Sequence, residues 1–156
     1  MNNKSPLRYP GGKTRACKIL EPILNNNLNI NSDTVLISPF FGGGSFEFYL
    51  QNKYQLRVIA NDKFKPLFNF WNESQKNNEK ICKKLENHIE STHITKEDFN
   101  NFRNNILNLK DPFEQAVYYF IINRCSFSGA TLSGGFSLEA SKKRFTKSSI
   151  LRVKNL

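Results

Sequence analysis

Residues 35–45 read Val-Leu-Ile-Ser-Pro-Phe-Phe-Gly-Gly-Gly-Ser, and this stretch decides the fold of the chain. Its first three residues are apolar, two of them β-branched, and they predict a buried strand. Glycines follow at positions 42–44, where the missing side chains allow backbone N–H groups to approach a ligand closely. We therefore predict a cofactor loop after a buried strand. The alternative is a structural glycine turn between a strand and a helix.

A second predicted strand, Val58–Ala60, stops at Asn61 and Asp62. An acidic residue at the tip of the neighbouring strand is where nucleoside-binding α/β folds hold ribose hydroxyls. The Gly-x-Gly-x-x-Gly fingerprint of dinucleotide enzymes does not occur in the sequence. Glu47 would lie in the first turn of the following helix, where its charge would repel a pyrophosphate. A cofactor without phosphates therefore fits better.

S-adenosylmethionine is such a cofactor, and the chain offers a candidate for each of its groups. Asp62 could hold the ribose, and Phe40 could make an apolar or cation–π contact with the sulfonium. Lys13, from the earlier segment Arg8-Tyr9-Pro10-Gly11-Gly12-Lys13, could bind the carboxylate. We therefore predict a cofactor site that joins the N-terminal segment to the glycine loop.

Four segments stand in the order seen in the Dam-type (D12 class) adenine-specific DNA methyltransferases. They are Tyr9–Lys13, Pro39–Ser45, Asn61-Asp62 and Asn123–Gly129. The chain resembles this family over almost its whole length. In that family the equivalents of Tyr9, Lys13 and Asp62 contact S-adenosylmethionine, and the fourth segment opens a DNA-recognition hairpin. With the glycine loop added, the predicted cofactor-binding residues are Tyr9, Lys13, Pro39, Phe40, Gly42, Gly44 and Asp62.

The resemblance also implies a fold and a division of the chain. We expect an α/β fold: an incomplete Rossmann-like, S-adenosylmethionine-dependent methyltransferase core with a helical DNA-recognition insert and a β-hairpin. Residues 1–65 are the expected cofactor-binding part of the core. Residues 66–140 are the expected target-recognition region, with the hairpin near 125–138. Residues 141–156 form a basic segment that would lead back to a catalytic part that the sequence does not contain.

Positive charge supports double-stranded DNA as a partner. The net charge is +10, and residues 101–156 hold nine basic against three acidic residues. Neutralised phosphates release counterions and so drive association, although Lys/Asn-rich composition can also reflect coding bias. The predicted DNA-binding residues are Asn123 and Arg124, the hairpin tip Thr131, Leu132 and Ser133, and the phosphate contacts Lys142, Lys143 and Arg144, with Lys147 beside them. The alternative is a solvent-exposed hairpin with Arg124 in a structural ion pair.

The family's catalytic motif, of the Asp-Pro-Pro-Tyr type, does not occur up to Leu156. The only Asp-Pro pair is Asp111-Pro112, which we interpret as a helix cap. A smaller departure is Ser38, where relatives often carry an acid before Pro-Phe. We therefore predict no catalytic residue within residues 1–156. A complete polypeptide of this sequence should bind cofactor and DNA with little or no methyl transfer. The alternatives are the N-terminal part of a longer enzyme, a truncated frame, or a split enzyme completed by a complementary chain.

Two other functional classes stay open. A catalytically inactive DNA-binding remnant or subunit would share every feature named above. An enzyme that acts on RNA or another amine would share the cofactor loop, but it would not need the segment that begins at Asn123. The sequence contains no apolar run of about eighteen residues and no Cys-x-x-Cys pair. We therefore expect neither a membrane partner nor a metal site, and we expect a cytoplasmic location.

Overall fold

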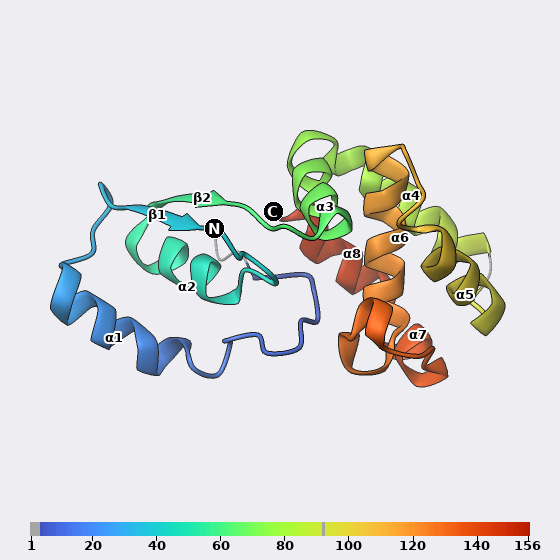
Figure 1. Ribbon diagram of the computed structural model, residues 1–156, viewed down its shortest axis with the longest axis horizontal. Helices are drawn as coiled ribbons and strands as arrows, with labels where there is room; N and C mark the ends of the chain where they lie inside the picture. The colour runs from blue at the N-terminus through green and yellow to red at the C-terminus, as the bar shows by residue number, and fades with distance from the viewer. Residues whose placement is uncertain (1–3, 92) are drawn as a thin grey trace.

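The computed structural model describes residues 4–91 and 93–156. Figure 1 shows the strands, α1 and α2 in one half of the molecule and α3 to α8 in the other. The elements in chain order are α1 (Cys17–Leu28), β1 (Val35–Ser38), α2 (Ser45–Tyr54), β2 (Arg57–Ala60), α3 (Lys65–Lys76), α4 (Asn78–Ser91), α5 (Lys96–Asn105), α6 (Pro112–Cys125), η1 (Phe127–Gly129), η2 (Thr131–Ser133), α7 (Leu138–Lys143) and α8 (Lys147–Lys154).

The sheet consists of β1 and β2, paired in parallel with Ile37 opposite Ile59. Both predicted strands are therefore confirmed, and they are neighbours in one parallel sheet. One face packs on α2, where Leu36 and Val58 contact a buried cluster. The other face leaves Ile37 68 % and Val35 48 % exposed. The prediction that this strand is buried is therefore correct for one face only, and the described residues show no larger Rossmann-like sheet.

The helical half is built around α6. Buried residues lie on every side of this helix, which is typical of a helix surrounded by other elements. The side chains of residues 119–122 are at most 1 % exposed. Helices α3, α4, α5 and α7 all pack on α6. Asp111 caps the helix by accepting a hydrogen bond from the backbone N–H of Phe113, with Pro112 at the first position. This confirms that the Asp-Pro pair is a helix cap.

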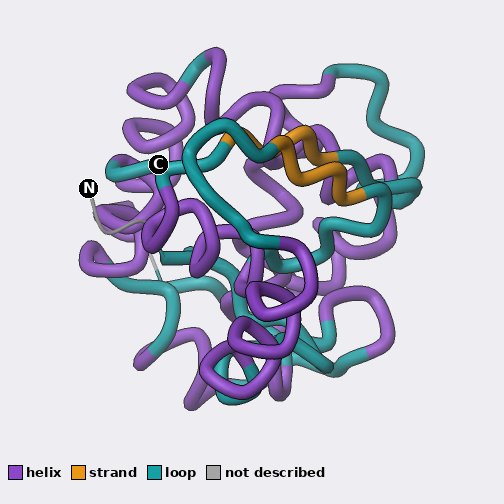
Figure 2. The backbone as a smooth tube through the Cα atoms, turned by 90° about the vertical axis from the view of Figure 1, so that its left-hand side faces the viewer, coloured by secondary structure: helices purple, strands orange, loops and turns teal. Residues whose placement is uncertain are grey.

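The β-hairpin predicted near residues 125–138 is wrong in its regular form. A single antiparallel bridge joins Ser126 and Phe136, and two 3-10 turns lie between them. Ser128 and Thr131 have φ values of 53° and 49°, in the left-handed region that extended strands do not use. The longest strand segments in Figure 2 are accordingly those of the β1–β2 pair. We call residues 126–137 the recognition loop.

Three findings concern membranes, metals and disulfides. Within residues 4–91 and 93–156, no helix is both long and apolar enough to cross a bilayer. The same part of the chain contains no group of three or more His, Cys, Asp or Glu side chains arranged to hold a metal ion. Cys17, Cys82 and Cys125 are free thiols, and all three are buried.

Candidate cofactor and DNA site

Tyr9 packs on the glycine loop and so brings the first two sequence motifs together. A Cβ atom added to Gly42 would lie 2.9 Å from Cε1 of the Tyr9 ring, and one added to Gly43 would lie 2.7 Å from the Tyr9 Cβ. Gly42 also has a φ of 53°, which side chains disfavour. The glycines are therefore needed because an aromatic residue closes over the backbone at this point.

Asp62 stabilises the same loop by accepting hydrogen bonds from backbone N–H groups. Its Oδ2 accepts a hydrogen bond of 2.9 Å from the backbone N–H of Gly42, and its Oδ1 accepts one of 3.0 Å from that of Phe64. Trp71 donates from its indole Nε1 to the carbonyl of Gly42 at 3.0 Å. A carboxylate can accept about four hydrogen bonds, so Asp62 keeps acceptor capacity for a ligand. The predicted ribose-binding residue therefore also stabilises the loop.

A cavity of about 240 Å³ opens beside Asp62, between α2, the end of β2 and α3. Its lining combines aromatic and polar side chains: Phe41, Glu47, Phe48, Gln51, Val58, Ala60, Asn61, Asp62, Phe68, Trp71, Asn72 and Gln75. Whole-ligand sites generally exceed about 300 Å³, so this cavity suits one flat part of a ligand. Among the predicted cofactor-binding residues, Asp62 is the one that lines it.

The carboxylate of Glu47 lies at the end of β1. Its Oε1 accepts a hydrogen bond of 2.6 Å from the hydroxyl of Ser38. Glu47 lies in the first turn of α2, as expected from the sequence. Glu47 of α2 therefore places a carboxylate beside Ser38, the position at which an acid is expected in relatives.

The other predicted cofactor-binding residues lie outside the cavity. Phe40 is 84 % exposed, and Pro39 beside it is also exposed. Lys13 is exposed, with its Nζ donating to the carbonyl of Gly11 at 2.8 Å. Gly44 is buried and begins α2 as its N-cap residue, with a φ of 65°. In the structure Tyr9 and Asp62 therefore both contact Gly42. Lys13 and Phe40 are exposed to solvent outside the cavity, on what we call the open side of the site.

Two phenols lie close to the Asp62 carboxylate. Partial burial raises the pKa of Tyr9, and the negative charge of Asp62 raises it further. Burial raises the pKa of Tyr119 far more strongly, and Tyr9 and Asp62 add to that effect. Both hydroxyl groups therefore stay protonated at neutral pH and remain hydrogen-bond donors.

Asn123 and Arg124 are placed in the interior, which corrects their predicted DNA contacts. Asn123 is 0 % and Arg124 is 7 % exposed. The Arg124 guanidinium donates to the carbonyls of Arg144 at 2.8 Å and Pro6 at 3.1 Å. Burial lowers the pKa of Arg124 to about 10, which leaves it charged at neutral pH. Both side chains hold backbone segments together and do not face a surface that DNA could reach.

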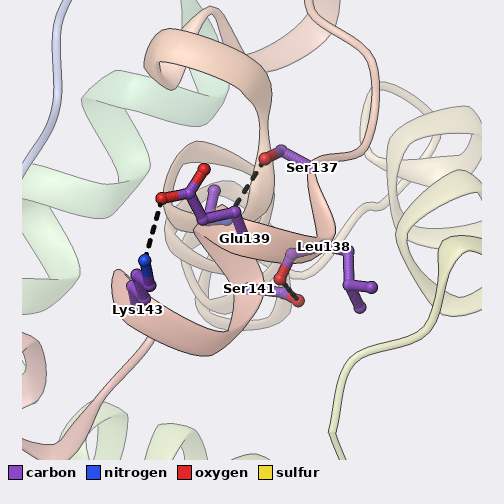
Figure 3. Close-up of polar contacts among 6 residues, drawn as sticks. Ser137, Leu138, Glu139, Ser141 and Lys143 are labelled. Atoms are coloured by element: carbon purple, nitrogen blue, oxygen red, sulfur yellow. Dashed lines mark hydrogen bonds and ion pairs between the residues drawn. The ribbon is translucent and has the colours of Figure 1, made fainter.

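The remaining predicted DNA-binding residues lie at or near the surface. Lys142, Lys143 and Arg144 are exposed at the end of α7, and Ser133 is exposed in the recognition loop, where Thr131 and Leu132 are half-buried. Figure 3 shows the ion pair between Lys143 and Glu139 of α7. The distance between Nζ of Lys143 and Oε1 of Glu139 is 3.1 Å. Exposed ion pairs of this kind are weak, so phosphates could replace the glutamate.

Phe127 is a candidate that the sequence reasoning did not select. It is 69 % exposed, while its backbone N–H donates to the carbonyl of Gly135 within the recognition loop. Exposed aromatic side chains on such loops can stack on nucleic-acid bases. Its position between two serines, Ser126 and Ser128, was the sequence signal that could have identified it. Arg103 of α5 was also missed, and it holds the loop by donating to the carbonyl of Gly134 at 3.1 Å.

Comparison with known proteins shows the family of the chain. The family model for D12 class N6 adenine-specific DNA methyltransferases matches residues 9–153. The Type II methyltransferase M.MjaIII of Methanocaldococcus jannaschii is 25 % identical over 142 residues, in a match that covers 83 % of this chain. The match covers 48 % of that relative, so the chain spans about half the relative's length. Since the family model covers nearly the whole sequence, the chain belongs to the D12 class N6 adenine-specific DNA methyltransferases.

Proposed function

We propose that this chain is the cofactor- and DNA-binding part of a site-specific DNA adenine methyltransferase. The observation that carries the proposal is the meeting of Tyr9, Gly42 and Asp62, which come from three separate motifs. They meet at the carboxyl ends of β1 and β2, where open α/β sheets bind their ligands.

The residues present fit S-adenosylmethionine, which supplies an activated methyl group when bound. In this proposal Asp62 accepts hydrogen bonds from the ribose hydroxyls with the acceptor capacity that the loop leaves unused. The aromatic cavity beside it takes the adenine. On the open side, Phe40 contacts the sulfonium and Lys13 the carboxylate. Tyr9, Pro39, Gly42 and Gly44 keep the loop in the shape that this requires.

Double-stranded DNA is the proposed macromolecular substrate. The exposed basic end of α7 would neutralise phosphates, and the recognition loop would present Thr131, Leu132, Ser133 and Phe127 to bases. The test is competition of DNA and RNA for the purified chain, followed in the same preparations by methyl transfer from labelled S-adenosylmethionine. We expect DNA to displace RNA and methyl transfer by the isolated chain to stay near background. Preference for RNA, or rapid methylation of DNA by the chain alone, would contradict the proposal.

A second candidate function, a catalytically inactive DNA-binding remnant or subunit, is favoured by one observation. The cavity beside Asp62 is smaller than a whole-ligand site, and neither Phe40 nor Lys13 lines it. Such a protein would bind DNA without binding S-adenosylmethionine. The same competition experiment, repeated with and without the cofactor, separates the two candidates.

We also propose that a complementary polypeptide covers the bare face of the sheet. Parallel sheets are almost always covered on both faces, yet Val35, Ile37 and Ile59 are 45–68 % exposed. M.MjaIII is about twice as long as the region matched here. The proposed occupant is therefore the part of the family fold that lies outside the match.

The probe for this surface is the unmatched part of M.MjaIII, expressed separately and immobilised. We expect it to retain the chain, and we expect Ile37→Lys to reduce retention strongly because a charge would enter an apolar interface. Ile19→Lys is the matched control, since Ile19 of α1 is also 68 % exposed. Equal retention of both variants, or none of the wild-type chain, would argue against this docking surface.

A further inference from the structure

Residues 6–9 lie between the recognition loop and the glycine loop. Figure 1 shows the N-terminal segment running between the half that contains the strands and the half that contains α6 and α7. Tyr9 is packed on Gly42 and Gly43, while Pro6 accepts a hydrogen bond from Arg124. A movement of either loop must therefore be accommodated by this segment.

Asn123 fixes the backbone of Arg8 from both sides. Its Oδ1 accepts a hydrogen bond of 3.0 Å from the N–H of Arg8, and its Nδ2 donates one of 2.6 Å to the carbonyl of the same residue. The Nδ2 atom also donates to the carbonyl of Gly129 in the recognition loop, at 3.3 Å. One fully buried amide thus connects the loop to the residue directly before Tyr9.

Gly129 makes the contact between the loop and Arg8 very close. A Cβ atom on Gly129 would lie 2.5 Å from the Cβ of Arg8 and 2.6 Å from its carbonyl oxygen. Gly129 also has a φ of 73°. Because closely packed segments transmit displacements, a shift of the recognition loop at this point must move Arg8.

We propose that Asn123 is a positioning residue that couples DNA binding at the recognition loop to cofactor binding at the glycine loop. It holds Arg8, and through Arg8 it holds Tyr9 against Gly42 and Gly43. DNA that holds the recognition loop in this arrangement also holds residues 6–9, so the cofactor meets a preformed site. This inference rests on the proposed function. Coupling between two sites is reciprocal, so the cofactor strengthens DNA binding by the same factor.

The test is a titration of the chain with S-adenosylmethionine, with and without a saturating mixed-sequence DNA duplex. For the wild-type chain we expect DNA to tighten cofactor binding by about 5-fold to about 100-fold, the usual range of such couplings. Asn123→Ala should bring this factor close to one. Asn69→Ala is the matched control, because it removes another buried amide, bonded to Gln115 at 2.6 Å, and should preserve the coupling.

The outcomes separate this inference from the proposed function. If the wild-type chain binds both ligands and its cofactor affinity is the same with and without DNA, the coupling does not exist. Full coupling in folded Asn123→Ala would also overturn the role of Asn123. Failure of the wild-type chain to bind either ligand rejects the proposed function instead. Should Asn123→Ala not fold, Gly129→Ala replaces it, since the added methyl group displaces Arg8 and should also abolish the coupling.

Discussion

Asp62→Ala is expected to weaken S-adenosylmethionine binding by about 100-fold or more. Hydrogen bonds to a charged group contribute about 1.5 to 3 kcal/mol each, and two ribose hydroxyls would lose their acceptor. The substitution also removes the bond that holds the N–H of Gly42, so the loop loses its support. Calorimetric titration measures the affinity, and a thermal melt shows whether the variant is folded.

Two further variants make this result interpretable. Asp62→Asn keeps an oxygen that can accept from Gly42, so it should bind more tightly than Asp62→Ala and less tightly than the wild-type chain. Asp33→Ala is the matched control, because Asp33 is an exposed carboxylate in the turn before β1 and should leave affinity unchanged. Wild-type affinity in folded Asp62→Ala would remove Asp62 from the cofactor site.

The triple substitution of Lys142, Lys143 and Arg144 by Ala is expected to give the second large effect. It should lower DNA affinity on every sequence tested, because phosphate contacts carry no sequence information. Each lost phosphate contact should also reduce the slope of log affinity against log salt by about 0.9. Binding measured at several salt concentrations gives both quantities.

The control for charge alone is the triple substitution of Lys76, Lys80 and Lys83 by Ala. These three lysines are exposed on α3 and α4, so the change in net charge is the same. We expect a much smaller change in slope for this set. An equal slope for both triple variants would show that DNA responds to overall charge and not to the end of α7.

The parts of the fold that depend on local chemistry could be predicted from the sequence. The β-branched runs formed β1 and β2, and Asp111 caps α6. Asp62 could be predicted as a site residue because the apolar pattern shows where the second strand ends, and Asp62 follows that end. Each of these features is determined within a few residues.

The parts that depend on distant contacts could not be predicted. Asn123 and Arg124 follow an apolar helical run, and their partners are backbone groups of Pro6, Arg8 and Arg144. Such buried polar groups must be hydrogen-bonded, but the sequence does not reveal which distant segment satisfies them. The hairpin prediction relied on residues 133–135, Ser-Gly-Gly, as a turn signal, whereas the positive φ values of tight turns occur at Ser128 and Thr131.

Calorimetric titration of the wild-type chain with S-adenosylmethionine tests the central claim most directly, since that claim is one cofactor site built from Tyr9, the glycine loop and Asp62. We predict saturable binding with one cofactor per chain, in the presence of DNA if not in its absence. A folded chain that binds DNA but takes up no cofactor under either condition would contradict the account and would favour the inactive DNA-binding remnant.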